Sequence, residues 1–352
     1  MATITYGDTG FGVDMLQTSV EELFYYDKTS SSSTLVKFFD DSKNYTSFSG
    51  TGLKVKTTSG MVTDVTAGTV TGINVVVDGK AAIIVTGLKL SASKLGDTVF
   101  AGNDAAFVAM ILAGNDTVNG TKYSDGLIGG DGDDTLNGNA GDDDFLGGAG
   151  ADRIVGGSGS DTAYYMFAAK GITASLAKAS INTNEAKGDT YSSVENLFGS
   201  EFADKLYGNE KGNFLSGNYG NDVISGAGGD DTFYGDKGAD DLYGGAGKDV
   251  FRFGDKSEST VASSGRDTIF DFSGVGGDKI DLYYMDANSK TTKDDAFTFI
   301  GTTAFHGKAG ELRYEKKASD TYIYGDTNGD KIADFAIHLD DAVTLSKGYF
   351  LL

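Results

Sequence analysis

Residues 129–164 read GGDGDDTLN, GNAGDDDFL, GGAGADRIV and GGSGSDTAY, which are four consecutive units of nine residues. Each unit is close to G-G-x-G-x-D-x-U-x, where U is a large apolar residue. Extending this phase upstream completes a first block of six units that ends at Tyr164, and a second block of six units, in a new register, runs from Gly199 to Arg252. A nonapeptide repeat of this type is the signature of a calcium-binding parallel β-roll. The sequence therefore predicts an all-β fold built from two such rolls.

Each residue type in the unit has a physical role. Glycine at the first, second and fourth positions permits backbone conformations that a Cβ would forbid, so the first six residues can form a tight turn. Aspartate at the sixth position supplies hard carboxylate oxygens, and calcium takes six to eight oxygen ligands. The last three residues form a strand whose central apolar residue points into the core. These core residues are Val118, Leu127, Leu136, Phe145, Ile154, Leu206, Leu215, Ile224, Phe233, Leu242 and Phe251.

Two units complete one coil of a roll, so each turn is expected to stack on the turn eighteen residues away. This register predicts about four calcium sites in each block, and Asn213, which is neutral, is expected to weaken its site. The units at the ends of the blocks, and GSEFADKLY at 199–207, fit the pattern least well. The pairs expected to share ions are Asp116 with Asp134, Asp125 with Asp143, Asp134 with Asp152, Asp143 with Asp161, Asp204 with Asp222, Asn213 with Asp231, Asp222 with Asp240, and Asp231 with Asp249.

Two other interpretations of the repeat are weaker. A flexible linker rich in Gly and Asp has no reason to keep an apolar residue two places after each aspartate. Paired catalytic carboxylates, as in a glycosidase, would form one site rather than a long series of equivalent ones. Glycine-rich turns and stacked carboxylates are costly to order. We therefore expect the blocks to be largely disordered without calcium, with folding and ion binding as one equilibrium.

Composition narrows the classes of partner. The chain has 352 residues and a net charge of −22, from 29 Lys and Arg against 51 Asp and Glu, which disfavours nucleic acid and anionic lipid as partners. It has no cysteine, which excludes disulfides and zinc–thiolate sites. The best apolar stretch, AAFVAMILA from Ala105, has about half the length of a transmembrane helix, so no transmembrane segment is expected. The start, MATITYGDTGFG, lacks the features of a Sec signal peptide.

Five segments are expected along the chain. They are an N-terminal β-rich (α+β) domain at 1–103, a first roll at 104–164, inserted strands that continue the stack at 165–198, a second roll at 199–252, and a C-terminal β-rich cap at 253–352. Within the inserted segment, ITASLAKA and TYSSVENL are each expected to form a strand. The cap should cover the open end of the roll, because an uncovered strand edge promotes aggregation.

The N-terminal domain is expected to begin with a helix and to continue with strands. The helix is indicated by apolar residues at helical spacing: Val13, Leu16, Val20, Leu23 and Phe24. Alternating β-branched segments follow, including TLVKFF, GLKVKTT and a hairpin around Asp78 and Gly79. A short helix at 104–112 is expected to cap the start of the first roll.

A different calcium motif is expected in the cap. In DTNGDKIAD, oxygen donors alternate as in a calcium-binding loop: Asp326, Asn328, Asp330 and Asp334. Lys331 stands where a glycine usually follows the third donor. A polar turn between two strands is the alternative interpretation.

The repeats and the C-terminal region resemble those of a known family. The repeats resemble the RTX (repeats-in-toxin) family, and the segment from DVFRFGDKSEST through GRDTIFDF and GDTNGDKIADFAIHL is similar to the serralysin C-terminal region, so that the resemblance covers residues 112–352. It implies export by a type I ABC transporter from an uncleaved C-terminal signal, here ending in GYFLL, and folding in calcium-rich surroundings outside the cell. It also implies that turn carbonyls join the aspartates as calcium ligands: those of Gly130, Gly132, Gly148, Gly150, Gly157, Gly159, Gly245 and Gly247.

The resemblance does not extend to an enzymatic activity. The only histidines are His306 and His338, and neither lies in the HExxH motif of a zinc protease. No G-x-S-x-G motif of a lipase is present. We therefore expect a secreted, extracellular, non-enzymatic calcium-binding protein that acts in a matrix, in adhesion to extracellular polysaccharide, or at a host surface.

Two alternatives remain open. In one, the rolls carry an enzyme whose site lies in residues 1–103, where the candidate acids are Asp14, Glu21, Glu22, Asp40 and Asp41. In the other, the chain is a membrane-active RTX protein, although it lacks the long apolar helices of the pore-forming members.

Overall fold

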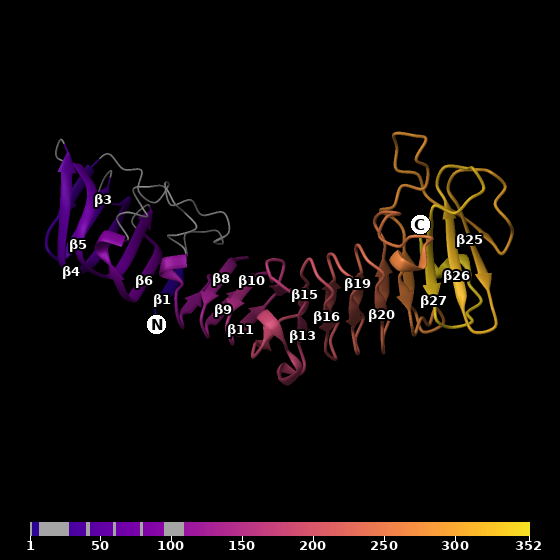
Figure 1. Cartoon of the computed structure of the whole chain (residues 1–352), viewed down its shortest axis with the longest axis horizontal. Helices are drawn as coiled ribbons and strands as arrows, with labels where there is room; N and C mark the ends of the chain where they lie inside the picture. Colours follow the sequence, from indigo (N-terminus) through magenta and orange to yellow (C-terminus); the bar gives the residue numbers. More distant parts are fainter. Residues whose placement is uncertain (1, 7–27, 40–42, 59–60, 78–79, 95–108) are drawn as a thin grey trace. The chain divides into compact units, whose positions relative to one another are not determined.

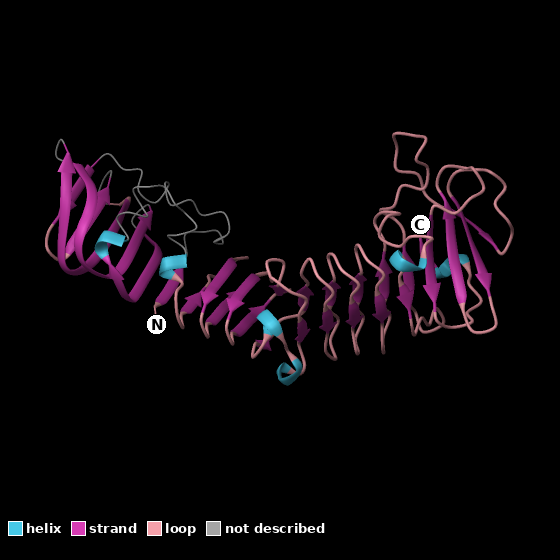
Figure 2. Ribbon diagram, viewed as in Figure 1, coloured by secondary structure: helices cyan, strands magenta, loops and turns pink. Residues whose placement is uncertain are grey.

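The computed structural model describes residues 2–6, 28–39, 43–58, 61–77, 80–94 and 109–352. The chain divides into two compact units, one made of Met1–Ala163 with Gly188–Val194 and the other of Tyr164–Lys187 with Glu195–Leu352. The described residues are almost entirely strands and turns, and their helices are short (Figure 2). This is the all-β class that the repeat predicts.

The first unit begins with an antiparallel sheet. Its strands are β1 (Thr3–Tyr6), β2 (Lys28–Ser31), β3 (Leu35–Phe39), β4 (Tyr45–Thr58), β5 (Met61–Val77) and β6 (Lys80–Ser91), and they pair in the order β1-β6-β5-β4-β3-β2 (Figure 1). The register of β5 with β6 joins Val77 to Lys80, which confirms the expected hairpin, although its two turn residues lie outside the described residues. The helix expected around 13–24 and the candidate acids at 14, 21, 22, 40 and 41 also lie outside them.

Strand β1 connects this antiparallel sheet to the first roll. It pairs antiparallel with β6, where Ile4 lies opposite Val85, and parallel with β7 (Thr117–Asn119), where Ile4 lies opposite Val118. The sheet therefore continues across residue 103, the expected domain boundary. Residues 109–111 are helical, within the segment where a capping helix is expected, and 95–108 lie outside the described residues.

The first roll consists of two stacks of parallel strands. One stack contains β7, β9 (Thr135–Ala140), β11 (Arg153–Ser158) and β14 (Thr190–Ser192). The other contains β8 (Gly126–Asp131), β10 (Asp144–Ala149) and β12 (Thr162–Tyr164). Leu136 lies opposite Ile154 and Leu127 opposite Phe145, a shift of eighteen residues that confirms two units per coil.

The second unit repeats this arrangement. One stack runs through β13 (Thr173–Ser175), β16 (Lys205–Tyr207), β18 (Val223–Ser225), β20 (Asp241–Tyr243) and β22 (Thr268–Ile269). The other runs through β15 (Asn196–Phe198), β17 (Phe214–Ser216), β19 (Thr232–Tyr234), β21 (Val250–Arg252), β23 (Lys279–Asp281) and β28 (Phe350–Leu351). Short 3-10 helices occur at η1 (Ala179–Ile181), η2 (Asn184–Ala186), η3 (Ser263–Gly265) and η4 (Lys347–Tyr349).

An antiparallel sheet covers the end of the second unit's strand stack, as expected for the cap. β25 (Glu311–Lys316), β26 (Thr321–Asp326) and β27 (Phe335–Leu339) pair antiparallel, and β24 (Thr298–Gly301) lies beside β25. β27 also pairs parallel with β22, where His338 lies opposite Thr268, so the cap sheet is continuous with the last coil. Such a cover removes an open strand edge.

The inserted segment differs from the expectation. TYSSVENL does not form one strand, because its residues divide between β14 and β15, which belong to different stacks. Its apolar residues Tyr191, Val194 and Leu197 are three apart, and a strand places only every second residue on one face. The chain therefore has to turn between them. ITASLAKA contributes only the three residues of β13 before the chain enters η1.

The core follows the eighth position of the repeat, as predicted. All eleven predicted core residues are at most 1% exposed. In the second unit, the rings of Phe233 and Phe251 stack in consecutive layers, with centroids 5.0 Å apart and planes at 14°. Each coil thus buries one apolar side chain from either strand stack, and the turns are free to present polar groups.

Candidate metal centre

The sixth-position aspartates form four ladders, two in each unit. In each step of a ladder, the backbone N–H of one residue donates to a side-chain oxygen of its partner eighteen residues later, for example Asp116 N to Asp134 Oδ1 at 2.6 Å and Asp222 N to Asp240 Oδ1 at 2.8 Å. The other six predicted pairs make the same bond at 2.7–3.0 Å. The structure thus brings all eight predicted pairs together, including Asn213 with Asp231.

Three further aspartates extend the ladders and were missed by sequence reasoning. Asp189 accepts the N–H of Asp152 at 2.9 Å, Asp267 that of Asp240 at 3.0 Å, and Asp278 that of Asp249 at 3.1 Å. They follow turns longer than six residues, so the phase of nine does not reach them. The remaining signal is an apolar residue two places later: Tyr191, Ile269 and Ile280.

One oxygen of most ladder carboxylates has no hydrogen-bond partner among the described residues. Oδ1 accepts the N–H of the neighbouring layer, whereas Oδ2 is buried and unpaired. A buried polar atom without a partner is costly, and a buried charge more so. The residues concerned are at most 3% exposed: Asp116, Asp134, Asp143, Asp152, Asp222, Asp231, Asp240, Asp249 and Asp267.

The electrostatics of the ladders disfavour charged carboxylates that have no bound cation. Burial, together with the charges of neighbouring ladder aspartates, raises the pKa of Asp143 and of Asp152 to about 7. Burial, together with the charges of Asp240 and Asp204, raises the pKa of Asp222 to about 9. At neutral pH, these groups need either a proton or a cation to be stable in the folded chain.

The first glycine of a unit makes room for the carboxylate of the same turn. A Cβ on Gly129 would lie 2.6 Å from Asp134 Oδ2, and one on Gly199 would lie 2.6 Å from Asp204 Oδ2. Neither glycine has a positive φ, so the constraint at this position is space rather than backbone conformation. This differs from the sequence-based expectation that all three glycines serve backbone conformation.

The glycines at the second and fourth positions do need unusual backbone angles. Gly148 has φ +93° and Gly150 φ +152°, and a Cβ on either would overlap the carbonyl of the turn one layer away. The other glycines assigned as carbonyl ligands by resemblance also have positive φ: Gly130, Gly132, Gly157, Gly159, Gly245 and Gly247. The turns therefore stack backbone against backbone, which gathers carbonyl groups around the buried carboxylates.

In three turns the sixth-position side chain is hydrogen-bonded by protein groups other than the next layer, and we call them closed turns: 120–125, 199–204 and 208–213. Thr121 donates its N–H and its hydroxyl to Asp125, at 2.5 and 3.2 Å. Ser200 does the same for Asp204, at 2.6 and 2.9 Å. The Asn213 amide accepts the N–H of Asn209 and donates to the carbonyl of Glu195, both at 2.7 Å. The units that contain these turns share the absence of glycine at the second and fourth positions, and their sixth-position side chains have less need of an ion.

The donor set of the remaining turns fits calcium. The turns of the nine aspartates named above each offer a buried, unpaired carboxylate oxygen beside backbone carbonyls, and hard oxygen ligands in flexible numbers are what calcium prefers. The residues that would hold the ions are the nine aspartates with an unpaired Oδ2, together with the turn carbonyls of neighbouring layers. A bound cation would supply the missing partner of each Oδ2 and offset the repulsion along the ladder.

The oxygen donors of the cap loop are engaged within the loop itself. Asp326 is fully buried and accepts the N–H groups of Gly329 at 2.6 Å and Lys331 at 2.9 Å. Asp334 accepts from Thr327 and from the amide of Asn328, while Asp330 accepts the N–H of Ile332. Lys331 has φ +72°, the conformation for which a glycine is usual at this place. The geometry is that of a hydrogen-bonded polar turn, and its use as a calcium site stays a prediction.

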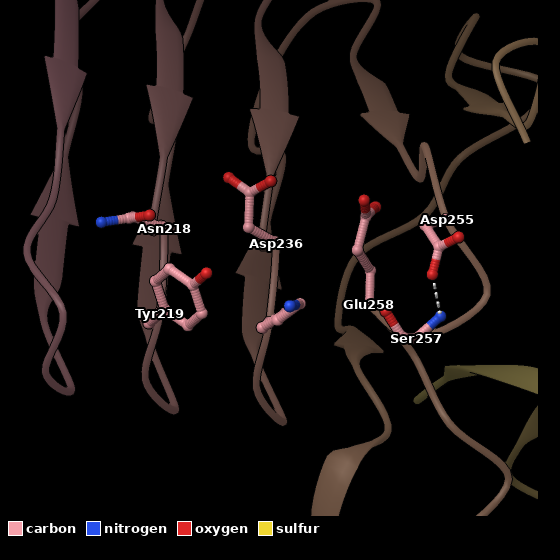
Figure 3. Close-up of a pocket in the computed structure, with 7 residues that line it drawn as sticks. Asn218, Tyr219, Asp236, Asp255, Ser257 and Glu258 are labelled. Carbon is pink, nitrogen blue, oxygen red and sulfur yellow. Dashed lines mark hydrogen bonds between the residues drawn. The ribbon is translucent and has the colours of Figure 1, made fainter.

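A polar cavity of about 370 Å³ lies beside the last layers of the second roll (Figure 3). Burial, with the charges of Asp236 and Asp255, raises the pKa of Glu258 in this cavity to about 7. The cavity therefore adds carboxylates next to the Asp240–Asp267 step of the ladder. Its lining comes from two turns stacked in adjacent layers and from a later loop: Asn218, Tyr219, Asp236, Lys237, Asp255, Ser257 and Glu258.

Comparison with known proteins agrees with this geometry. The family model "Peptidase M10 serralysin C terminal" matches residues 111–348. The chain belongs to the serralysin C-terminal family. The match begins with the first coil and ends within η4, after the last cap strand, so this family covers both rolls and the region between them. No curated protein matches the chain as a relative.

Solved structures with similar parts include two subunits of the Azotobacter vinelandii mannuronan C5-epimerase. AlgE6R2 is 28% identical, with a TM-score of 0.34, and the match covers 45% of this chain and 91% of that one. AlgE6R3 is 22% identical, with a TM-score of 0.32, over 43% and 78%. The extracellular lipase LipA from Serratia marcescens is 19% identical, with a TM-score of 0.26, over 68% and 40%. In the described part of this serralysin C-terminal chain, no helix is long and apolar enough to cross a membrane.

Proposed function

We propose that this chain is a secreted calcium-binding protein whose rolls fold around calcium ions, and that it has no catalytic activity of its own. The observation that carries the proposal is the series of buried Oδ2 atoms without hydrogen-bond partners. The folded chain is stable only if each buried carboxylate oxygen has a partner. A cation can be that partner, and it also removes the repulsion between stacked carboxylates.

Calcium acts here as a structural ion. The ligands come from turns far apart in the chain, so the sites do not exist in the unfolded state, and ion binding contributes directly to folding. Calcium-poor conditions then favour the unfolded chain and calcium-rich conditions the folded one. A chain that stays unfolded in the cytosol and folds outside is suited to type I export, which the serralysin C-terminal family suggests.

The equivalence of the carboxylates supports a non-enzymatic role. The ladder residues repeat the same hydrogen bond and the same burial in layer after layer, whereas a hydrolytic pair would stand out from its neighbours. The proposed role is extracellular, in a matrix or in adhesion to polysaccharide or a host surface. Calcium-dependent retention of the pure chain on immobilised polysaccharide tests this part. Equal retention in chelator would count against it.

Equilibrium dialysis with radioactive calcium in a large excess of magnesium tests the central proposal. We expect several calcium ions per chain, and fewer for Asp222→Asn, which changes a buried ladder oxygen. Asp341→Asn is the matched control, because that residue is exposed and its side chain makes no ladder bond. Absence of bound calcium in the unaltered chain would contradict the proposal.

Export is tested separately, in cells that contain a type I exporter. Removal of the last five residues, GYFLL, should leave the chain inside the cells. Equal export of the shortened chain would show that GYFLL is not needed as an export signal, and it would leave the calcium proposal unaffected.

A further inference from the structure

A histidine and two aspartates lie together on the cap beside the last coil, where the backbone N–H of His338 donates to the carbonyl of Asp267 at 3.0 Å. His338 belongs to β27, Asp340 follows two residues later, and Asp320 immediately precedes β26. The register of β26 with β27 joins Tyr322 to His338 and Thr321 to Leu339, so Asp320 comes next to Asp340. Strand alternation places residues two apart on one face. One ligand atom from each of the three side chains lies within 4.8 Å of the others.

The imidazole of His338 is held in a fixed orientation. Its Nδ1 lies 3.1 Å from Thr268 Oγ1, and its Nε2 lies 2.9 Å from Asp320 Oδ1. The ring also stacks on Tyr322, with centroids 4.7 Å apart and planes at 15°. Metal-bound histidines are usually held in this way, with the second ring nitrogen hydrogen-bonded to a neighbouring group. In the described geometry Nε2 donates to Asp320 Oδ1, and a cation that displaces this proton would take the Nε2 lone pair, with the remaining proton on Nδ1 facing Thr268 Oγ1.

The site is open to solvent and has unused ligand capacity. The side chains of His338 and Asp320 are 17% and 27% exposed, and Asp340 is exposed. Within the described part of the chain, the Asp340 carboxylate makes no hydrogen bond. A shared cation would use all three groups.

The mixture of ligands selects the class of ion. Calcium and magnesium bind oxygen, whereas an imidazole nitrogen with carboxylate oxygens suits zinc and its neighbours. Three protein ligands leave a further coordination position for water. We propose that Asp320, His338 and Asp340 form a site for a divalent transition metal ion of the zinc class, distinct from the calcium ladders. All three ligands lie on or next to β26 and β27, so the ion would join these two cap strands, while Thr268 of β22 would orient His338 from the last coil.

The chain has only two histidines, which makes the site directly testable. The experiment titrates the calcium-saturated full chain with Co²⁺, followed by visible absorption, and then displaces Co²⁺ with Zn²⁺. We expect one tight Co²⁺ site, which His338→Gln weakens by more than about 100-fold and Asp340→Asn by about 10-fold or more. His306→Gln is the matched control and should bind as the unaltered chain does, because His306 lies 2.8 Å from a single carboxylate, that of Glu311.

A positioning variant distinguishes ligand loss from unfolding. Thr268→Val removes the partner of Nδ1 but no ligand, and it should weaken Co²⁺ binding by about 10-fold while the absorption spectrum of the saturated site is retained. Asp340 is exposed, so its variant should fold normally, and equal calcium-dependent circular dichroism verifies this for each protein. Failure of the calcium-saturated chain to bind Co²⁺, or unchanged binding in both His338→Gln and Asp340→Asn, would overturn the proposal.

Discussion

The backbone N–H of Asp134 donates to Oδ1 of Asp152 across 2.9 Å, while Oδ2 of the same Asp152 carboxylate is buried and has no partner in the described part of the chain. One oxygen thus holds two layers of the roll together, and the other is left for a cation. The same two roles of Oδ1 and Oδ2 recur in all four ladders. The stacking that sets the strand register therefore also creates the unpaired oxygens that need calcium.

The difference between open and closed turns gives a first prediction. Asp143 has an unpaired Oδ2, whereas Asp125, in the same ladder, is bonded to Thr121. Asp143→Asn should raise the calcium concentration at the folding midpoint by about tenfold or more, since contacts of a buried charged group are worth about 1.5–3 kcal/mol. Asp125→Asn should have a clearly smaller effect. Calcium titrations followed by intrinsic tyrosine fluorescence compare the two, and equal midpoints would contradict the assignment of closed turns.

The first glycine of the repeat gives a second prediction. Gly129→Ala places a Cβ 2.6 Å from Asp134 Oδ2, and it should destabilise the calcium-loaded protein by about 1–3 kcal/mol in chemical denaturation. Gly254→Ala is the control, because its Cβ would lie 3.4 Å from the end of the flexible Glu258 side chain and its φ is ordinary. The control should change stability by less than about 0.5 kcal/mol. A tolerated Gly129→Ala would show that space beside the carboxylate is not limiting.

Much of this arrangement follows from the sequence, because the repeat is short and each of its positions has one role. The phase of nine places Asp134 above Asp116 and buries Leu136 beside Val118 without any further information. It fails where turn length changes: Asp189, Asp267 and Asp278 join the ladders through longer turns, and only tertiary stacking brings them into register.

Other features depend on contacts that the pattern does not encode. The pairing of β1 with both β6 and β7 joins Thr3 to residues 86 and 117, which are distant in sequence. The closed turns depend on hydroxyl groups of Thr121 and Ser200, which the pattern treats as imperfect matches to glycine. The cap site depends on strand register, since Asp320, just before β26, and His338, on β27, are eighteen residues apart in sequence.

The raised pKa values give a prediction for the calcium-free chain. Aspartates such as Asp143 and Asp152, with pKa values of about 7 in the fold against an ordinary value of 3.8, bind more protons folded than unfolded between these values. Stability in chelator should therefore fall as pH rises from about 4 to about 7, and further to about 9 because of Asp222. Thermal melts in chelator at pH 5 and pH 8 check the sign. Greater stability at pH 8 would contradict it.

Calcium should reverse this pH dependence, because protons compete with the ion for the same oxygens. The apparent calcium affinity should decrease on acidification from pH 8 to pH 5. An affinity that is independent of pH in this range would argue against these carboxylates as ligands.

The stacked aromatic core gives a prediction that does not involve the metal. Phe233 is fully buried against Phe251, and Phe233→Ala should cost about 3–5 kcal/mol in denaturation of the calcium-loaded protein. Phe167→Ala is the control, because that ring is 66% exposed and should contribute little. Similar losses of unfolding free energy in both variants would contradict the special contribution of the layered core to stability.

The most direct test of the central claim is a calcium titration of the full chain by far-UV circular dichroism, starting in chelator at pH 8. The ladders predict little β-structure in chelator and a cooperative gain as calcium is added, which magnesium does not reproduce. Complete β-structure in chelator at this pH, unchanged by calcium, would contradict the account, because the buried Oδ2 atoms of the ladders would then be stable without an ion.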